Sequence, residues 1–533
     1  MVRLASHAGE RIVPTPPTSP LCLGAPRQMR IVKPIIRRLL LAPRREVVVD
    51  DSREWRAYQL YFGALHLAKA IQRTSNAQHI GLMLPTSALF PMAMLGTWML
   101  GRTIVPLNYL LKSQDLEYVI ADADLDTVVT VTPMIDYVGS LPAGINQIRL
   151  DQMSFKGLPP MRRCRRRPDD HLAALLYTSG TSGKPKGVML TVGNLAANVR
   201  QCVQWVGFTR SDSLLGVLPQ FHSFGLTVLT LLPFTVGCKV IYTARFLPRK
   251  ILTLLRTHRP TAMIGIPSMY NALLQSKSAT ADDFSSLRYI VSGGEPLPRS
   301  VFDGFAQRFN VAIKEGYGLT ETGPVTNWCR PQDDKTGSVG MALPDVQQKI
   351  VAPDGTRLGV DEDGEVCVRG PNIMPGYFKL PQQTAEVFDD EGYFKTGDIG
   401  RVDADGYLRI TGRIKEMLII GGENVFPREI EEALNAHPAV QDSAVIGMPD
   451  PARGEVPLAF VELSEGAAFD QSALRSHCRE RLAQFKVPRE IRVLQELPRN
   501  PTGKIMRREL SVQTTKLPPG EAPAVLGQQD QSD

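Results

Sequence analysis

The chain has 533 residues, a formal net charge of +7 and an ordinary hydrophobic share of 43%. It is longer than one hydrophobic core usually supports, so we expect two or more domains. The charge is modest for this length and no stretch interleaves basic with aromatic residues, so we expect no nucleic-acid partner. The seven cysteines are scattered without a C-x-x-C pair, which is typical of reduced thiols and a cytoplasmic location.

Residues 1–45 are rich in arginine and proline, and Glu10 is their only acid. They lack the apolar stretch and cleavage site of a secretory signal, and no later segment has the apolar run that a membrane-spanning helix needs. We expect a disordered extension here. The segment from Arg37 to Leu41 and the basic run at residues 162–167 both have a composition that suits a membrane surface, which leaves peripheral membrane association open.

From residue 47 the sequence alternates between short apolar runs and helix-like segments. We expect strands at residues 80–84, 103–107, 128–132, 172–177, 214–218, 239–242, 262–266 and 287–292. Such alternation predicts an α/β fold with parallel sheets covered by helices. After residue 337, Asp-Gly pairs separate short alternating runs and predict a small antiparallel subdomain. From residue 416 another α/β pattern follows, with helices near residues 427–435 and 471–483.

The strand at residues 172–177 leads into a loop that is rich in glycine and hydroxyl side chains. Glycines let the backbone approach an anion, hydroxyls and amides donate to its oxygens, and two lysines add positive charge, so the loop suits a polyphosphate. It is not the common P-loop, because Thr178 stands where that pattern needs a glycine and Pro185 follows Lys184. Its candidate phosphate-binding residues are Thr178, Ser179, Gly180, Thr181, Ser182, Gly183, Lys184 and Lys186.

Further motifs follow along the chain. Tyr317 lies between two glycines and can lie flat on a purine ring, while the carboxylate of Glu321 suits Mg²⁺, which prefers hard oxygen ligands. Later segments place Asp398 after a Thr-Gly pair, Arg413 in a Gly-Arg-Ile-Lys-Glu run, and Lys504 after a glycine near the end. Each of these on its own is commonly a turn or a charged linker.

Together, and in this order, the motifs resemble those of the adenylate-forming superfamily, which includes acyl-CoA synthetases, amino-acid adenylation domains and luciferases. The resemblance covers about residues 47–508. It implies a large N-terminal AMP-binding domain of parallel α/β sheets with a small β subdomain, and a smaller mobile C-terminal α+β domain. We expect a disordered extension over residues 1–45, the large domain over 46–413, a hinge over 414–416, the small domain over 417–512 and a disordered tail over 513–533.

The resemblance also implies roles for single residues. Asp398 binds the ribose hydroxyls, Lys415 is the hinge, and Gly421 and Gly422 line the tunnel for the CoA arm. Lys504 neutralises charge at the reacting α-phosphate, and removing such a group typically costs ~10²–10³ in rate. The ATP- and AMP-binding residues beyond the loop are Gly294, Glu295, Tyr317, Gly318, Thr320, Asp398 and Arg413. The catalytic residues are Lys504, His222, Thr181 and Glu321, and the last two also hold the metal.

The segment at residues 219–225 matches the family segment at the carboxylate-binding end of the acyl site. Amino-acid-activating members carry an aspartate just after its aromatic residue, where this chain has His222. A buried ammonium without a partner would be costly, so an uncharged acyl or aryl tail fits best. The expected acyl-pocket residues are His222, Phe224, Gly225, Ile266, Gly293 and Val325.

We therefore expect an AMP-forming acid–thiol ligase that uses ATP, Mg²⁺ and coenzyme A. It would convert a carboxylic acid to acyl-AMP and then to the CoA thioester, with a medium- or long-chain fatty acid as the first choice and an aryl acid as the second. Two other interpretations stay open: an acyl-AMP ligase that loads an acyl carrier protein, and a non-catalytic acyl-nucleotide-binding protein. Lys504, Glu321 and the two loop lysines argue against the last. A homodimer also stays open.

Overall fold

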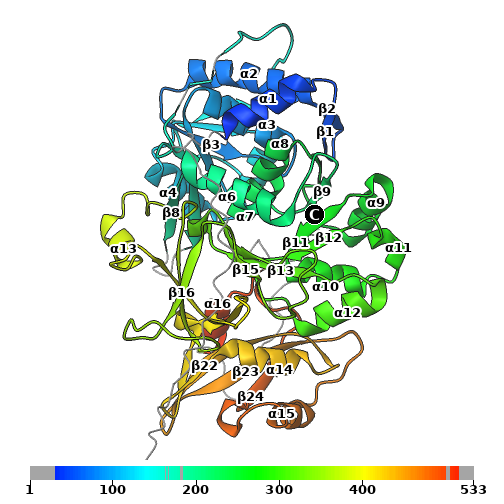
Figure 1. The fold of residues 1–533 in the computed structure, drawn as a ribbon, viewed down its shortest axis with the longest axis vertical. Coiled ribbons are helices and arrows are strands. Elements are labelled where there is room, and N and C mark those ends of the chain that lie inside the picture. Colours follow the sequence, from blue (N-terminus) through cyan, green and yellow to red (C-terminus); the bar gives the residue numbers. More distant parts are fainter. Residues whose placement is uncertain (1–30, 163, 166, 180–183, 500–503, 515–533) are drawn as a thin grey trace, which may run out of the picture.

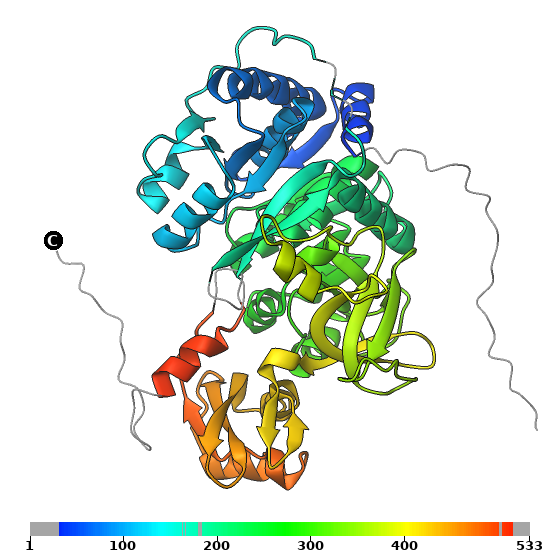
Figure 2. The ribbon, with the colours of Figure 1, turned by 90° about the vertical axis from the view of Figure 1, so that its left-hand side faces the viewer.

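The computed structural model describes residues 31–162, 164–165, 167–179, 184–499 and 504–514. In these residues the chain forms four sheets with helices packed on them (Figure 1). Three sheets and most of the helices precede residue 417, and the fourth sheet follows it. A view turned by 90° shows this C-terminal part below the larger N-terminal part (Figure 2).

A six-stranded sheet has the order β6-β5-β3-β4-β7-β8. All neighbouring pairs are parallel except β7 with β8. Helices α2 and α3 pack on one face and α4 and α5 on the other. The elements are β3 (His79–Met83), β4 (Thr103–Pro106), β5 (Thr127–Thr130), β6 (Asn146–Arg149), β7 (Leu172–Ser179), β8 (Pro185–Thr191), α2 (Ala57–Thr74), α3 (Leu89–Met99), α4 (Ser113–Asp122) and α5 (Thr132–Val138).

A nine-stranded sheet has the order β15-β14-β13-β12-β11-β9-β10-β1-β2, and its central strands from β13 to β1 are parallel. Successive residues point to opposite faces, so that Met263 packs under α9, α10 and α12 while Ile264 packs toward α6 and α8. The strands are β1 (Glu46–Val49), β2 (Glu54–Arg56), β9 (Ser213–Gly216), β10 (Lys239–Tyr242), β11 (Ala262–Gly265), β12 (Tyr289–Ser292), β13 (Lys314–Gly318), β14 (Val325–Trp328) and β15 (Met341–Ala342). The helices are α6 (Val192–Val206), α7 (Ser223–Leu226), α8 (Leu232–Val236), α9 (Pro248–His258), α10 (Pro267–Gln275), α11 (Ala281–Phe284) and α12 (Arg299–Phe309), with a π-helical turn at Thr227–Leu231.

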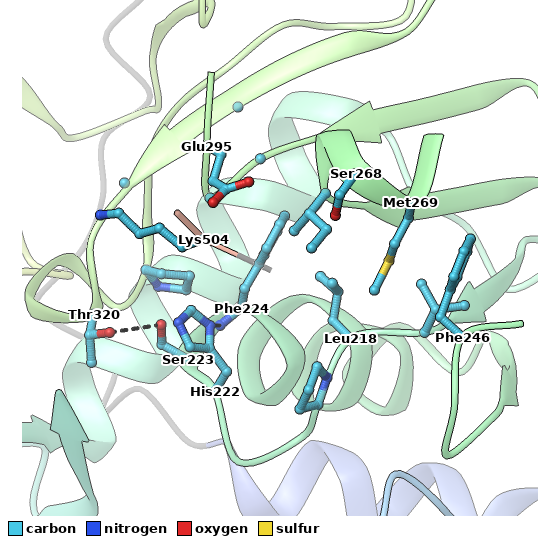
Figure 3. A pocket seen from close by; sticks show the side chains of 18 of the residues that line it. Leu218, His222, Ser223, Phe224, Phe246, Ser268, Met269, Glu295, Thr320 and Lys504 are labelled. Atoms are coloured by element: carbon cyan, nitrogen blue, oxygen red, sulfur yellow. Dashed lines mark hydrogen bonds between the residues drawn. The ribbon is translucent and has the colours of Figure 1, made fainter. Parts of the chain in front are cut away.

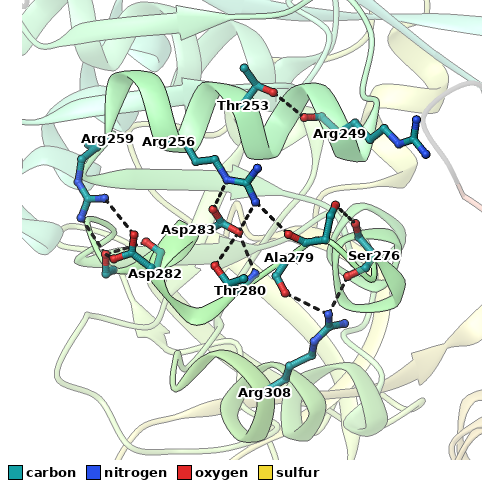
Figure 4. Close-up of polar contacts among 12 residues, drawn as sticks. Arg249, Thr253, Arg256, Arg259, Ser276, Ala279, Thr280, Asp282, Asp283 and Arg308 are labelled. Atoms are coloured by element: carbon teal, nitrogen blue, oxygen red, sulfur yellow. Dashed lines mark hydrogen bonds and ion pairs between the residues drawn. The ribbon is translucent and has the colours of Figure 1, made fainter.

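A polar cluster joins three of the helices on this sheet (Figure 4). Arg256 of α9 donates two hydrogen bonds to Asp283 of α11, at 2.5 and 3.0 Å, and the same carboxylate accepts from the backbone N–H of Thr280 at 2.8 Å. Arg308 of α12 donates to the carbonyl of Ala279 at 3.1 Å. Burial raises the pKa of Asp283, but the hydrogen bonds from Arg256 and Thr280 outweigh it and lower the pKa.

The two remaining sheets agree with the small antiparallel subdomain expected after residue 337 and the α/β pattern expected from residue 416. The first is a four-stranded antiparallel meander of β16 (Gln347–Val351), β17 (Gly364–Arg369), β18 (Phe394–Val402) and β19 (Leu408–Arg413), with α13 (Pro381–Glu386) inserted in it. The second contains β20 (Leu418–Ile420), β21 (Glu423–Val425), β22 (Val440–Asp450), β23 (Gly454–Leu463) and β24 (Glu490–Val493), with α14 (Pro427–Asn435), α15 (Gln471–Arg479) and α16 (Arg507–Thr514). The predicted fold class, with large parallel α/β sheets, a small β subdomain and a small C-terminal α+β part, is confirmed.

The expected disorder up to residue 45 is wrong for residues 31–45. Helix α1 (Val32–Leu41) packs on α2, α3 and α8. Ile31, Ile35 and Leu39, spaced four residues apart, form its buried face. Pro34 lies in the first turn, where a proline removes no helical hydrogen bond, so it does not break the helix. Of the proposed membrane-facing segment, Leu39 is buried, while Leu40 and Leu41 are exposed.

A second difference concerns the residues after the phosphate loop. No strand is expected there from the sequence, but residues 185–191 form β8, which pairs antiparallel with β7. Pro185 is the first residue of this strand, where a missing N–H is tolerated. Thr191 caps α6, because its hydroxyl accepts the backbone N–H of Asn194 at 3.1 Å at the start of this helix. No helix in the described ranges has the length and apolar character to cross a bilayer.

Candidate active site

A cavity of about 800 Å³ lies at the carboxyl ends of the parallel strands of the nine-stranded sheet (Figure 3). Its lining includes residues in the segments that follow these strands: Leu218 after β9, Phe246 after β10, Ile266 after β11 and Gly293 after β12. Carboxyl ends of parallel strands are the usual ligand-binding edge of α/β sheets. Figure 3 shows Lys504 and Glu295 at one end of this cavity and Phe246 at the other.

Three motifs that are distant in the sequence meet at the end of the cavity that carries Lys504. Tyr317 on β13 donates a hydrogen bond to Asp398 on β18 at 2.6 Å, and Arg413 on β19 forms an ion pair with the other oxygen of Asp398 at 2.6 Å. The Asp398 side chain is only 2% exposed. Burial lowers the pKa of Arg413, but the carboxylates of Asp398 and Glu416 outweigh it and raise the pKa. Tyr317 and Arg413 line the cavity, and Asp398 lines a neighbouring one.

Lys504 comes from the C-terminal part of the chain and lines the same cavity. Burial and the positive charge of Arg413 lower its pKa, and the carboxylates of Glu416, Glu295 and Asp398 act in the opposite direction. Glu295 also lines the cavity, and its pKa is raised by burial against the opposing charges of Arg499 and Lys504. The structure thus places a lysine ammonium in a largely enclosed site, where its charge is weakly screened.

Glu321 lines the cavity beside the phosphate-loop strands. The hydroxyl of Tyr377 donates to its carboxylate at 2.9 Å, and burial raises the pKa of Glu321. Within the described ranges no three His, Cys, Asp or Glu side chains cluster as metal ligands. A single carboxylate still fits Mg²⁺, which is commonly held by one or two carboxylates together with substrate phosphates. The other proposed ligand, Thr181, lies outside the described residues.

The phosphate loop is described at its two ends only, because Gly180, Thr181, Ser182 and Gly183 lie outside the described residues. Thr178 lines the cavity, and Ser179 ends β7 next to it. The Lys184 ammonium lies 5.3 Å from the ring centre of Tyr118, and that of Lys186 lies 5.2 Å from the ring of Tyr377, the partner of Glu321. Lys186 is therefore close to the proposed metal carboxylate.

His222 caps the short helix α7, and its Nδ1 accepts the backbone N–H of Phe224 at 3.3 Å. This arrangement places the proton of a neutral ring on Nε2. The ring is exposed to the cavity, yet the cavity lies deep in the protein, so burial and the charge of Lys504 lower the pKa of His222 to about 4. His222 is therefore a neutral hydrogen-bond donor at pH 7. The next hydroxyl, of Ser223, lies 3.2 Å from that of Thr320, which ties this segment to the Tyr317 motif.

The expected acyl-pocket residues Phe224, Ile266, Gly293 and Val325 all line the cavity, as do Gly294, Gly318 and Thr320 from the expected nucleotide site. A Cβ on Gly293 would lie 3.0 Å from the Phe224 ring, so glycine keeps this part of the cavity open. Gly225 differs from the expectation, because it does not line the cavity. It is buried, and a Cβ there would overlap the carbonyl of Pro219, so this glycine allows α7 to pack closely.

Sequence reasoning missed the outer end of the cavity, which is lined by Tyr109, Tyr137, Arg245 and Phe246. Arg245 and Tyr137 are exposed, so the cavity opens to solvent here. Tyr109 follows β4, Arg245 and Phe246 follow β10, and Tyr137 lies in α5; none of them belongs to a motif. The available signal was their position: residues just after parallel strands lie at the ligand-binding edge.

The expected hinge and CoA-tunnel residues lie away from this cavity. Lys415 is in a 3₁₀ turn, Ile414–Glu416, that connects β19 to the C-terminal part. Gly421 and Gly422 form the tight turn between β20 and β21, with positive φ angles of 62° and 88°, and both are exposed. In this arrangement the C-terminal part presents Lys504, and not the Gly421–Gly422 turn, to the cavity.

Two contacts fix this arrangement at the junction. Arg428 on α14 donates a hydrogen bond to the backbone carbonyl of Ile410 on β19. The ring of Phe426 packs directly over Gly412, at a distance that leaves no room for a Cβ. A cavity of about 220 Å³ between the two parts is lined by several charged residues, which include Glu295, Glu315, Asp398, Arg428, Glu431 and Arg507.

Comparison with known proteins gives a consistent result. A family model for AMP-binding enzymes matches residues 38–378, and a model for the AMP-binding enzyme C-terminal domain matches residues 429–504. The chain is 32% identical over 502 residues to a long-chain-fatty-acid–CoA ligase of Bacillus subtilis (strain 168), which covers 85% of this chain and 89% of that one. It is 33% identical over 463 residues to a sulfoacetate–CoA ligase of Cupriavidus necator, with 84% and 90% covered. The solved structure of ATP-bound MatB from Rhodopseudomonas palustris is similar with a TM-score of 0.85 at 30% identity, over 91% of this chain and 99% of that chain.

The two family matches fall on the large and small parts of the fold in the expected order. The relatives are named as CoA ligases, which confirms both the resemblance to adenylate-forming enzymes and the expected class of AMP-forming acid–thiol ligases. The cavity, its motifs and these matches together show that the chain belongs to the family of AMP-binding enzymes.

Proposed function

We propose that the protein is an ATP-dependent acyl-CoA ligase that activates an acid as acyl-AMP and transfers the acyl group to CoA. The observation that carries this proposal is the convergence of Lys504, His222 and the Tyr317–Asp398–Arg413 cluster on one cavity. A purine can lie against Tyr317, and the carboxylate of Asp398 has lone pairs left for ribose hydroxyls after its two protein contacts.

In the first step, the substrate carboxylate attacks the α-phosphorus of ATP, and the bond to the bridging oxygen breaks to release pyrophosphate. Nε2–H of His222 can donate to the carboxylate and hold it for attack. Lys504 supplies positive charge at the end of the cavity where the α-phosphate would lie, and it neutralises charge that develops in the transition state. Thr178 and the loop residues 179–186 would hold the leaving phosphates.

Glu321 and Thr181 are the residues that we propose as magnesium ligands. Glu321 offers a buried carboxylate at the cavity, next to Tyr377 and Lys186. When bound there with the nucleotide, Mg²⁺ supplies charge neutralisation on the phosphates.

In the second step, the thiol of CoA attacks the acyl-adenylate carbonyl and AMP leaves. Lys504 and the Gly421–Gly422 turn lie on the same part of the chain, and only Lys504 reaches the cavity here. We propose that residues 417–512 rotate as a small domain about Lys415 between the two steps. The rotation would withdraw Lys504 and bring the Gly421–Gly422 turn toward the acyl group, where the absence of side chains admits the thin arm of CoA.

For the acid we propose a medium- or long-chain fatty acid. The middle of the cavity is lined by Leu218, Phe224, Ile266, Met269 and Val325, which suit an uncharged tail. Because the outer end opens to solvent, the cavity has no closed end that limits chain length. Aryl acids are the alternative for the same apolar lining, and an acyl carrier protein is the alternative acceptor.

One observation favours a second substrate class. Arg245 lines the outer end of the cavity beside Tyr109, where its cation could pair with an anionic group at the far end of the substrate. An acid with a second anionic group, such as a dicarboxylate, would use it. Arg245→Ala should then lower kcat/KM for dicarboxylic acids and leave monocarboxylic fatty acids nearly unchanged.

The deciding experiment is a panel of fatty, aryl, dicarboxylic and amino acids with ATP and Mg²⁺, with CoA, a carrier protein or no acceptor. We expect AMP and pyrophosphate as products, with turnover on addition of CoA. Release of ADP and phosphate would overturn the proposal, and a preference for a free amino acid would overturn the proposed acyl site. Turnover with a carrier protein but not with CoA would show that the acceptor is a carrier protein and not CoA.

A further inference from the structure

A separate cavity of about 170 Å³ lies at the opposite edge of the six-stranded sheet from the active site. It is lined by Gln72, Met99, Leu100, Arg102, Arg162 and Arg165. Arg102 directly precedes β4, whereas the active-site residue Tyr109 follows the same strand. Arg162 and Arg165 belong to the connector between β6 and β7, and neither lines the active-site cavity.

The guanidinium groups of this cavity are incompletely satisfied by the protein. Arg102 donates from Nη2 to the carbonyl of Ser75 at 2.8 Å, and Arg162 donates from Nη2 to the side chain of Gln72. In the part of the chain that the structure describes, Nη1 of Arg102 and Nε of Arg162 are buried and have no hydrogen-bond acceptor. Buried donors without an acceptor are rare and costly, so they indicate a missing acceptor.

The charges around the cavity also favour an anion. Three arginines line it, and the lining contains no acid. Burial and the charge of Arg165 lower the pKa of Arg102, and Asp126 only partly offsets this. Asp126 is itself engaged, because it accepts the hydroxyl of Ser75 at 2.6 Å. A tetrahedral oxyanion would supply acceptors to the unsatisfied nitrogens and relieve the repulsion between the arginines.

The same connector carries large apolar side chains into solvent. Leu158 is 90% exposed and Met161, which precedes Arg162, is 70% exposed. Such residues next to a basic cluster are typical of a surface that contacts an anionic bilayer, with the apolar groups among the acyl chains and the cations at the headgroups. In Figure 2 this connector, in cyan, and the C-terminal part lie at opposite ends of the molecule. Contact with a membrane here would leave the C-terminal part clear of the bilayer.

We propose that the arginine cavity binds the phosphate of an anionic lipid headgroup, and that Leu158 and Met161 insert beside it, so that the protein docks on membranes through this edge. Free phosphate would offer the arginines the same oxyanion as a lipid headgroup does. The exposed side chains of Leu158 and Met161 favour a lipid as the source of the phosphate.

The test is co-sedimentation of the full chain with vesicles of phosphatidylcholine, with and without phosphatidylglycerol. We expect binding to the anionic vesicles that weakens with salt, and no binding to neutral ones. Each basic residue near an anionic surface contributes about fivefold to partitioning, so Arg162→Gln with Arg165→Gln should lower it roughly 25-fold. Leu158→Ser with Met161→Ser should also lower it without a change of charge. The charge-matched control is Arg249→Gln with Arg357→Gln, two exposed arginines elsewhere, which should lower partitioning much less.

Adenylation in vesicle-free solution and the melting temperature show whether each variant is folded, and both should match wild type. Equal vesicle binding by wild type and the Arg162/Arg165 variant overturns the proposal, as does failure of wild type to bind. Equilibrium dialysis with inorganic phosphate is the second arm. Arginine-dependent phosphate binding without vesicle binding would identify a site for free phosphate and overturn the lipid assignment.

Discussion

The hydroxyl of Tyr317 donates a 2.6 Å hydrogen bond to Asp398, which is held from its other oxygen by Arg413. Two residues 81 positions apart, expected to contact adenine and ribose, are thus positioned by each other before any nucleotide binds. The Asp398 side chain is buried, so its orientation depends on these two contacts.

Tyr317→Phe keeps the ring and removes the donor to Asp398. Hydrogen bonds to charged groups contribute about 1.5–3 kcal/mol, so we expect the KM for ATP to rise roughly tenfold or more with a smaller change in kcat. Steady-state pyrophosphate release measures both. Tyr393→Phe, whose hydroxyl lies 3.4 Å from Gln347 in the β subdomain, is the matched control. An unchanged KM would show that Asp398 is held without Tyr317.

Lys504→Ala should lower acyl-adenylate formation by ~10²–10³, because the lysine acts on charge that develops in that step. Thioester formation from chemically made acyl-AMP should be largely spared. Both half-reactions are followed in single turnover. The control is Lys486→Ala, another lysine of the C-terminal part, which pairs with Glu429 at 2.6 Å. Equal loss in both half-reactions would contradict this role for Lys504.

His222 should stay neutral across the physiological pH range, because its pKa is lowered to about 4. Protonation as the pH falls through that value would turn its ring into a cation beside Lys504, but above about pH 5 its state is constant. The pH profile of single-turnover adenylation should therefore show no inflection near 6.5 that depends on His222. His222→Ala should lower the rate about 10²-fold at every pH from 5 to 8. An inflection near 6.5 that disappears in His222→Ala would contradict the neutral state.

Lys415→Pro should separate the two steps. Proline fixes φ near −65° and removes the N–H, so a hinge at this residue could no longer rotate. Adenylation should be nearly intact and thioester formation should fall by orders of magnitude. Lys415→Ala, which removes the side chain and keeps the backbone free, is the control and should support both steps. Normal CoA transfer in the proline variant would exclude Lys415 as the hinge, and loss of both steps would point to misfolding.

Gly412→Ala should destabilise the present arrangement of the N-terminal and C-terminal parts of the fold. The added Cβ would overlap the ring of Phe426, and such overpacking costs about 1–3 kcal/mol. If only the present arrangement bears this cost, adenylation should fall roughly tenfold and thioester formation should not. The double variant with Phe426→Ala should recover adenylation. Failure of the second substitution to restore the rate would show that the clash lies elsewhere.

Local patterns predicted much of this molecule. Eight strands of the two parallel sheets, from β3 to β12 without β6 and β8, and the hairpins after residue 337 follow from short stretches of sequence. The Tyr317, Arg413 and Lys504 motifs were also visible, and the structure places them at one cavity.

The features that could not be predicted depend on contacts between distant parts of the chain, or on burial that outweighs an unfavourable local composition. Tyr109 and Arg245 follow strands of different sheets, so their proximity depends on how the two sheets pack together. Apart from their position after a strand, no motif marks them. Helix α1 was missed because its composition favours disorder, while burial of Ile35 and Leu39 against α2, α3 and α8 stabilises it. Gly225 was assigned to the acyl pocket by its motif, but its role is close packing under Pro219.

The contact of Arg428 with the carbonyl of Ile410 has a consequence for how this enzyme can be altered. The proposed rotation of the C-terminal part would break it, so the contact would contribute to the balance between the two proposed arrangements. One partner is a backbone atom that every amino acid at position 410 would supply. Selection or engineering can therefore tune this one contact only from the Arg428 side, by shortening, neutralising or repositioning one side chain, whereas substitutions at residue 410 should leave it almost unchanged.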